Sequence, residues 1–562
     1  MLPNSPDAFS EAGWDEIRPH FEELAVRPLD MDNVEQWLSD WSRLDSMLSE
    51  AAALANFAYT CNTADPAREA AQLRFGTEIG PKAHEQGAAL QKRLVELGYV
   101  RPGLETMVER FQNQAELFRE SNVPLLSELS RLVTQWSKAV GALTVEWEGE
   151  EKTPAQLLPF LESPDRGTRE RAFKLRAQAY LRKRDVLAGL FDQMLELRQQ
   201  VAHNAGFADF RDFTHREKNR FDYTPDDCVR FHEAVEEALL PAVDRILERR
   251  RRQMGLDRLR PWDTGVDPQG RPALRPFQAV DELVGRGAAV LGHVDPDFRG
   301  YLTSMADAGL LDLDNRKGKA PGGYSTTLSF RKMPLIFMNA VGIDDDVRTL
   351  LHEAGHAFHS FEASKLPLLF QRHPGSEMAE VASMSMELLA APFIDTAHGG
   401  YYSEEEARRS RAELLEGTIL FFPHCASVDA FQQWIYTQEE GRDADARDSK
   451  WLQLRRRFEG GGVDWSGLEQ ERIARWYQQP HFFGNPFYYI EYGIAQLGAL
   501  QVWRNSMRDE KQAVAGYRSA LALGATRRLP DLFAAAGARL IFDPKGMKEI
   551  VEVVEEQLAR LE

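Results

Sequence analysis

The chain contains 562 residues and carries a formal net charge of −19 at pH 7. This length exceeds what one small core requires, so we expect either two lobes or one large helical body. An acidic chain offers few cations to phosphate backbones or anionic lipids, which argues against nucleic acid as a partner. The three cysteines are odd in number and far apart in sequence, which argues against a disulfide framework and a thiolate metal site.

The cysteines and the start of the chain together predict a cytoplasmic location. Residues 1–7 lack the basic region and apolar run of a secretory signal. No uninterrupted apolar stretch reaches membrane-spanning length. We therefore expect no membrane partner and a reducing environment.

The first third of the chain shows helical periodicity. Apolar residues recur at steps of three and four between Val34 and Ala51, which predicts a helix with one buried stripe. Ser163-Pro164-Asp165 begins another helical stretch that runs through Leu190 to the region of Gly206. We place a domain boundary near residue 190, between an N-terminal helical region (1–190) and a catalytic region (191–562).

One strand pair is predicted in the middle of the chain. Residues 324–330 and 335–339 are rich in β-branched and aromatic side chains, and Gly322-Gly323 precedes them. Helical periodicity returns after Asp344 and continues to the end, where an apolar stripe runs from Met547 to Leu561. The expected fold class is mainly α, two-lobed, with a small β-sheet at a deep substrate channel.

The segment His352-Glu353-Ala354-Gly355-His356 has the pattern HExxH. On a helix, the spacing of four residues places both imidazoles on one face, where two neutral nitrogens can bind one Zn²⁺. Glu353 lies beside the first histidine and can accept a proton from a water on the metal as a general base. The alternative interpretation is a pair of surface histidines without a metal.

A catalytic zinc needs a third protein ligand, and the acidic helix Ser376–Ser383 is the obvious donor downstream. Glu380 is the predicted ligand, and Glu377, one turn earlier, is the alternative. Glu387 lies about two turns later and can accept an imidazole N–H. His359 does not match the spacing of the third histidine in the metzincin pattern and is predicted either to pack in the core or to support a ligand from behind.

Several further motifs resemble one known family, the thimet-oligopeptidase-like zinc peptidases, and specifically their oligoendopeptidase F branch. The resemblance covers most of the chain. The segments that carry it are Pro321–Ser325, Ile336–Asn339, His352–His359, Ala379–Ser383 with Glu387, Phe431–Tyr436, and the aromatic segment His481–Tyr492.

This resemblance implies roles for particular residues. It makes Glu380 the third zinc ligand, in agreement with the spacing argument. It implies that His481, Tyr488, Tyr489 and Tyr492 donate hydrogen bonds to the reacting carbonyl, while aromatic residues at helical spacing alone would suggest core packing. Which of Tyr488 and Tyr489 matches the family's transition-state tyrosine stays open. The turn at Gly322 and Gly323 and the strand end at Asn339 resemble the family's substrate edge.

The expected function is therefore a zinc-dependent endopeptidase for short peptides, with one Zn²⁺ per chain and N-terminal helices that narrow the channel. Two alternatives are kept. One is a zinc carboxypeptidase or peptidyl-dipeptidase of a related helical fold. The other is a peptide-binding scaffold that has lost catalysis. Subsite preferences and oligomeric state are not predicted.

Overall fold

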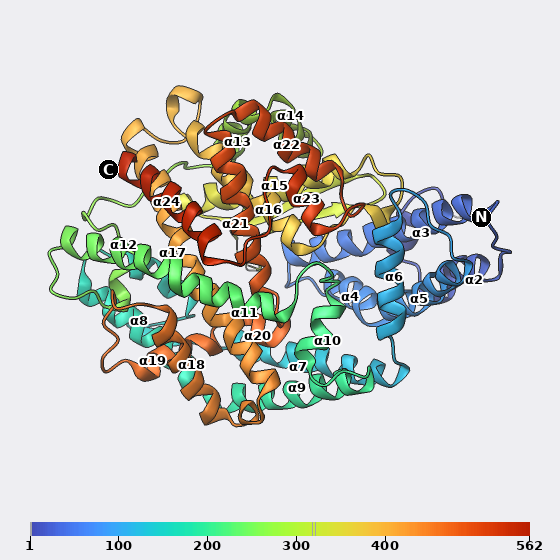
Figure 1. Cartoon of the computed structure of the whole chain (residues 1–562), viewed down its shortest axis with the longest axis horizontal. Coiled ribbons are helices and arrows are strands. Elements are labelled where there is room, and N and C mark those ends of the chain that lie inside the picture. The colour runs from blue at the N-terminus through green and yellow to red at the C-terminus, as the bar shows by residue number, and fades with distance from the viewer. Residues whose placement is uncertain (1–2, 317, 321, 562) are drawn as a thin grey trace. The chain divides into compact units, whose positions relative to one another are not determined.

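The computed structural model describes residues 3–316, 318–320 and 322–561 and is mainly helical (Figure 1). This confirms the predicted fold class of a helical protein with a small sheet. The chain divides into two compact units made of interleaved segments: unit 1 contains residues 1–116, 274–411 and 495–540, and unit 2 contains residues 117–273, 412–494 and 541–562.

Neither boundary of these units falls at residue 190, which lies inside helix α9 (Arg184–Asn204) of unit 2. The functional division at that residue stays a prediction. Among the described residues, no helix combines the length and the apolar composition needed to cross a membrane.

The N-terminal helices of unit 1 enclose one apolar core. The predicted stripe lies on α3 (Val34–Cys61), and its members are buried as expected: Val34, Trp37, Leu38, Trp41, Leu44, Met47, Leu48 and Ala51. They pack with side chains from the neighbouring helices α2 (Trp14–Val26), α5 (Gly80–Leu97) and α6 (Glu105–Leu117). Unit 1 also contains α1 (Asp7–Ser10), α4 (Pro66–Arg74), α13 (Val280–Val294), α14 (Pro296–Asp307), α22 (Glu510–Ala522) and α23 (Leu529–Ala535).

Unit 1 also carries a three-stranded sheet of order β3-β5-β4. The predicted pair is confirmed as β4 (Tyr324–Leu328) antiparallel to β5 (Met333–Ala340). The parallel strand β3 (Leu311–Asp314) was not predicted, because it is short and follows a helix without a strand-like run of its own. The buried carboxylate of Glu50 on α3 accepts hydrogen bonds from the backbone N–H groups of Phe330 and Arg331, which ties the β4–β5 turn to the N-terminal helices.

The turn from β5 into helix α15 (Asp344–Ala363) is held by one side chain. The buried Oδ2 of Asp346 accepts hydrogen bonds from the N–H groups of Val341, Gly342 and Ile343 at 2.8, 2.7 and 2.9 Å. Gly342 has φ +88, which a glycine adopts without strain. These bonds satisfy donors at the start of the helix and fix its direction relative to the sheet.

Unit 2 is built around aromatic residues, among them Phe431, Trp451, Trp476 and Phe482. Its helices include α7 (Val123–Gly141), α8 (Arg166–Leu181), α9, α10 (Phe210–Glu217), α11 (Pro225–Ala234), α12 (Leu240–Gln253), α18 (Ala444–Phe458), α19 (Glu469–Tyr477), α20 (Pro480–Gly484) and α24 (Pro544–Leu561), and β1 (Val145–Trp147) pairs with β2 (Glu150–Lys152). Two long helices, α17 (Glu404–Thr437) and α21 (Tyr489–Ser506), each begin in one unit and end in the other. The predicted C-terminal stripe is buried on α24, except for the half-buried Leu561.

Replacing Asp346 with alanine is expected to lower the free energy of unfolding by about 1–3 kcal/mol, because three backbone donors lose their acceptor. The change is measured as a lower midpoint of urea unfolding. The matched control is Asp281→Ala, which removes an exposed carboxylate from the first turn of α13. An equal shift in both variants would contradict a special role for Asp346.

Candidate metal centre

Helix α15 contains the HExxH segment, and one face of this helix is buried in the core. Leu350, Ala354 and Phe358 are fully buried, so the register of the helix is fixed by packing. His352 and His356 lie one turn apart on the less buried side, with ring centroids 5.0 Å from each other. The predicted placement of both imidazoles on one helix face is what the structure contains.

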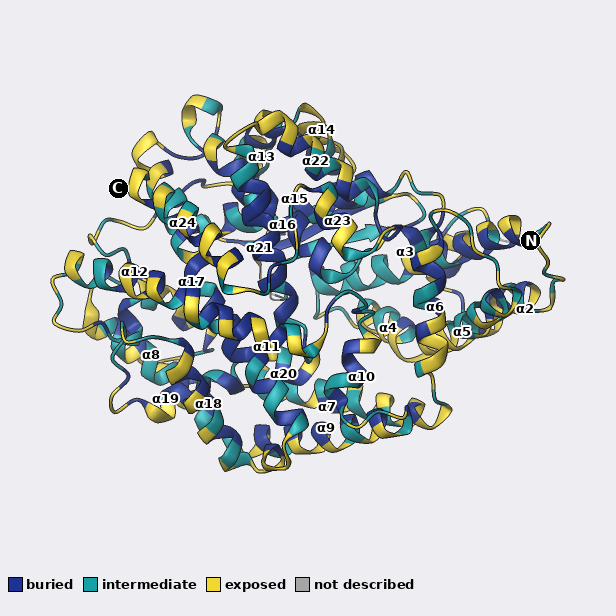
Figure 2. Ribbon diagram, in the orientation of Figure 1, coloured by how far each residue is buried: buried dark blue, intermediate teal, exposed yellow. Residues whose placement is uncertain are grey.

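Helix α16 (Ser376–Ala390) packs against α15 at unusually close range, and Figure 2 shows both helices largely in the colour of buried residues. Gly355 allows this approach. A Cβ atom at that position would lie 2.6 Å from the backbone oxygen of Ala382 and 2.6 Å from Cα of Ser383. Only a glycine therefore permits the observed separation of the helices, and this separation brings Glu380 to the two histidines.

Three side chains converge between these helices. Oε2 of Glu380 lies 3.4 Å from Nε2 of His352 and 3.6 Å from Nε2 of His356. Two ligands about 2.1 Å from a tetrahedral zinc are about 3.4 Å apart, so the donor atoms fit such an ion. Among the residues that the structure describes, these three form the one cluster with metal-ligand spacing. Glu377 and His359 are not part of it.

Glu387 orients the first histidine. Its Oε1 lies 2.7 Å from Nδ1 of His352, so the imidazole donates its Nδ1–H to the carboxylate and keeps Nε2 for a ligand. This arrangement, a carboxylate behind a ligating histidine, is common at metal sites. The structure thus contains the contact that the sequence predicted for Glu387.

The charges of the cluster suit a cation. Burial would raise the pKa of Glu380, but the adjacent His352 and His356 lower it to about 2, so the carboxylate is ionised. Burial lowers the pKa of His356 to about 4, which keeps this imidazole neutral. For His352, burial acts in the same direction, but the carboxylates of Glu380 and Glu387 raise its pKa well above the usual value. A cation bound here would replace the proton of His352.

Glu353 is buried beside the cluster, with 7% of its surface exposed. Burial raises its pKa to about 7. Its Oε2 makes no hydrogen bond to any residue that the structure describes. A buried carboxylate oxygen without a partner is costly, and a pKa near neutrality suits a group that both accepts and returns a proton.

The predicted substrate edge lies beside β4, which is an edge strand of its sheet. Nδ2 of Asn339 donates hydrogen bonds to the backbone oxygens of Ala320 and Gly322 at 2.8 and 2.9 Å. Gly322 has φ +94, and Gly323 packs against the backbone of β5. The structure therefore brings Gly322, Gly323 and Asn339 together, with Asn339 holding the turn; contact with a substrate stays a prediction.

The predicted histidine and tyrosines belong to unit 2 and form a cluster of half-buried rings. The ring of His481 lies 5.9, 5.0 and 6.0 Å from the rings of Tyr488, Tyr489 and Tyr492. Partial exposure distinguishes them from ordinary core aromatics.

The residue before the tyrosines has a strained backbone. Phe487 has φ +61, an uncommon value for a bulky residue. Its N–H donates to Oε1 of Gln432 at 2.7 Å, and its carbonyl accepts from Nη2 of Arg220 at 2.5 Å. Both partners are buried. These two bonds hold the conformation that directs the chain into Tyr488.

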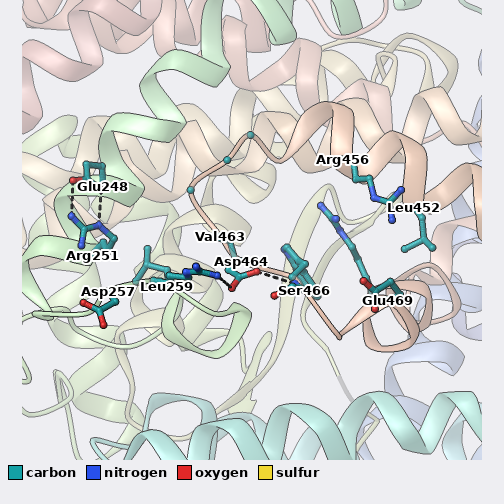
Figure 3. A pocket seen from close by; sticks show the side chains of 16 residues that line it. Glu248, Arg251, Asp257, Leu259, Leu452, Arg456, Val463, Asp464, Ser466 and Glu469 are labelled. Carbon is teal, nitrogen blue, oxygen red and sulfur yellow. Dashed lines mark hydrogen bonds and ion pairs between the residues drawn. The ribbon is translucent and has the colours of Figure 1, made fainter.

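A cavity of about 610 Å³ lies elsewhere in unit 2, between α12, α18 and the glycine turn 460–462 (Figure 3). Its wall contains four arginines and four acids. Figure 3 shows Arg251 against Glu248, an ion pair of 2.7 Å, and Arg258 pairs with Asp464 at 3.3 Å. None of the predicted site residues lines this cavity, so its size does not identify the functional site.

Comparisons with known proteins agree with this geometry. The model described as Peptidase family M3 matches residues 160–285 and 295–552, and the Peptidase M3 N-terminal domain matches residues 8–117. The chain belongs to peptidase family M3. It is a metalloendopeptidase of the oligoendopeptidase F kind, as the sequence motifs predicted.

Similar proteins support the assignment over most of the chain. "Oligopeptidase PepF" of Bacillus subtilis is 21% identical over 84% of this chain and 70% of its own length. "Oligoendopeptidase F homolog" of Borreliella burgdorferi is 22% identical over 74% of this chain and 70% of its own. The solved structure "PZ peptidase A with inhibitor 2" has a TM-score of 0.89 at 26% identity, covering 98% of both chains.

Two residues that build the site were not predicted. Gly355 occupies an unspecified position of the HExxH pattern, although a glycine inside a helix is itself a signal of close packing. Asp346 is an acid in the first turn of a helix after a strand, which is a recognisable capping position. Both sequence signals are local, and neither indicates which residue Gly355 or Asp346 contacts.

Replacing Gly355 with alanine is expected to force α15 and α16 apart. We expect a loss of about 1–3 kcal/mol in unfolding free energy from overpacking and a metal affinity about 10–100-fold weaker. Metal affinity is measured by competition with a chromogenic chelator. Gly285→Ala, inside α13 where an added Cβ meets no atom within 4 Å, is the control and should bind metal normally. Unchanged affinity in Gly355→Ala would refute the packing argument.

Proposed function

We propose that this protein is a zinc-dependent endopeptidase that hydrolyses internal bonds of short oligopeptides, with Glu353 as the general base. One Zn²⁺ per chain is held by His352, His356 and Glu380. The observation that carries the proposal is the convergence of these three donors beside a buried Glu353 oxygen that has no hydrogen-bond partner among the described residues. A cytoplasmic location stays a prediction.

Glu353 performs the proton transfers of the reaction. Bound Zn²⁺ supplies Lewis acidity, which lowers the pKa of water and polarises a peptide carbonyl. Oε2 of Glu353 accepts a proton from the attacking water and returns it to the leaving amine. Glu387 keeps Nε2 of His352 directed at the metal through its bond to Nδ1. The peptide bond is replaced by a carboxyl group and an amine, with one water consumed.

The remaining assignments come from the resemblance to the family. His481, Tyr488, Tyr489 and Tyr492 are proposed to donate hydrogen bonds to the oxyanion that develops on the attacked carbonyl. The turn at Gly322, Gly323 and Asn339 is proposed to receive an extended peptide through main-chain hydrogen bonds along β4. These assignments are supported by the partial exposure of the four rings and by the position of β4 at the edge of its sheet.

Replacing Glu353 with glutamine removes the base and leaves the three ligands in place. We expect normal zinc content and a fall in kcat of at least about 10²-fold, because an amide cannot accept the proton. Glu380→Gln is the matched comparison, and we expect it to have a lower zinc content because a ligand is lost. Zinc content is measured by atomic absorption and turnover with a quenched fluorescent peptide. Undiminished turnover in Glu353→Gln would refute the mechanism.

The cleavage pattern separates the endopeptidase from its alternatives. A peptide blocked at both ends should be cut at internal bonds, lose cleavage with a chelator and regain it with Zn²⁺. Products are mapped by mass spectrometry. Cleavage only of peptides with free ends would indicate a carboxypeptidase or peptidyl-dipeptidase. A zinc-loaded protein that binds a varied panel of peptides without cutting any would indicate a scaffold.

A further inference from the structure

A chain of side-chain hydrogen bonds ends at His481. It begins with Arg455 on α18, passes through His424 on α17, and reaches Gln479, the residue before α20; these helices lie near one another in Figure 1. Nη1 of Arg455 lies 3.0 Å from Nδ1 of His424. Nε2 of His424 lies 3.3 Å from Oε1 of Gln479, and Nε2 of Gln479 lies 2.6 Å from Nδ1 of His481.

The chemistry of Arg455 decides which atom donates in each hydrogen bond of this series. A guanidinium group can only donate, so Nδ1 of His424 must accept. A neutral His424 then carries its proton on Nε2 and donates to Oε1 of Gln479. The amide nitrogen of Gln479 in turn donates to Nδ1 of His481, which must be unprotonated. The proton of His481 is therefore on Nε2.

Both histidines are neutral in this arrangement. Burial and the nearby Arg455 and Arg475 hold the pKa of His424 well below its usual value. Burial, with a smaller effect of Lys218, lowers the pKa of His481 to about 4. The rings of Tyr488, Tyr489 and Tyr492 also lie against His481.

Nε2 of His481 has no protein acceptor in the part of the chain that the structure describes. No described residue is hydrogen-bonded to it, and the side chain is half-buried. The ring is held edge-on by Tyr489, which also contacts His424 in the same manner. Arg455 is anchored in its turn by an ion pair with Glu459. The result is an N–H donor with fixed orientation and fixed protonation.

We propose that Arg455, His424 and Gln479 are positioning residues that fix His481 as an Nε2–H donor to the carbonyl oxygen of the peptide under attack. The inference rests on the proposed function and deepens it. A donor of this kind stabilises a developing oxyanion most when its proton is already in place, because no tautomer change has to precede the reaction. His481 is then a hydrogen-bond donor and not an acid.

The variant Gln479→Glu tests the donor and acceptor order of these hydrogen bonds with a side chain of nearly the same shape. A carboxylate only accepts, so His481 must donate through Nδ1, and neutral His481 then presents a bare Nε2. We expect kcat to fall about 10²-fold near neutral pH, with a smaller change in KM. The carboxylate also raises the pKa of His481, and the imidazolium again carries a proton on Nε2. Activity relative to the unmodified protein should therefore rise as pH falls through that pKa.

Two controls isolate this effect. Gln478→Glu makes the same charge change one residue away, at the C-terminal end of α19, and should keep the original pH profile. Gln479→Met removes the donor without adding an acceptor, so neither tautomer of His481 is imposed, and kcat should fall less than in Gln479→Glu. Zinc content and the unfolding midpoint are measured for each variant, so that a folding defect is recognised.

The tautomer is measured directly on the full chain labelled with ¹⁵N-histidine, with His481→Gln used to assign the signal. The expected spectrum has a protonated Nε2 and an unprotonated Nδ1 at His481. In Gln479→Glu, neutral His481 should instead have a protonated Nδ1 and an unprotonated Nε2. A proton on Nδ1 in the unmodified protein, or an unchanged kcat and pH profile in Gln479→Glu, would overturn the inference. Failure of the proposed function looks different: the unmodified protein would cut no peptide, whatever the tautomer.

Discussion

The close contact of α15 with α16 at Gly355 is the constraint on which the rest of the site depends. HExxH supplies two imidazoles, but two ligands do not make a catalytic metal centre. The third must come from another helix, and its carboxylate reaches the imidazoles only because a Cβ is missing where the backbones of Gly355 and Ala382 meet. The cap of Asp346 and the apolar side of α15 then hold the helix in the register that this contact requires.

The site concentrates polar groups that a folded protein would otherwise avoid burying. Glu353, Glu380 and Glu387 gather around two histidines, and one oxygen of Glu353 has no partner among the described residues. Desolvation of carboxylates costs free energy unless a counter-charge is present. A divalent cation bound here would provide that counter-charge, so the ion proposed to supply the chemistry would also offset the free-energy cost of burying these groups.

The two units differ in the charge states of their functional side chains. Unit 1 holds the ionised carboxylate of Glu380 beside an imidazole pair. In unit 2, His424 and His481 are kept neutral, and their proton positions are set by hydrogen bonds that start at an arginine. In unit 2, the strained backbone of Phe487 also costs free energy, and hydrogen bonds to Gln432 and Arg220 hold it in this conformation. Strain of this kind persists where the surrounding structure fixes it, and here it directs the chain into Tyr488.

The sequence by itself determined the helical class, the strand pair, the buried stripes of α3 and α24 and the candidate ligands, because each of these depends on spacing along one element. His352 and His356 follow from a period of 3.6 residues, and Glu380 and its alternative Glu377 follow as candidates from an acidic helix downstream. Only the tertiary structure decided that Glu380 rather than Glu377 meets the histidines, that Gly355 is what allows it, and that Arg455 sets the proton of His481. These depend on contacts between residues far apart in the chain, and local periodicity carries no information about which helices meet or at what distance.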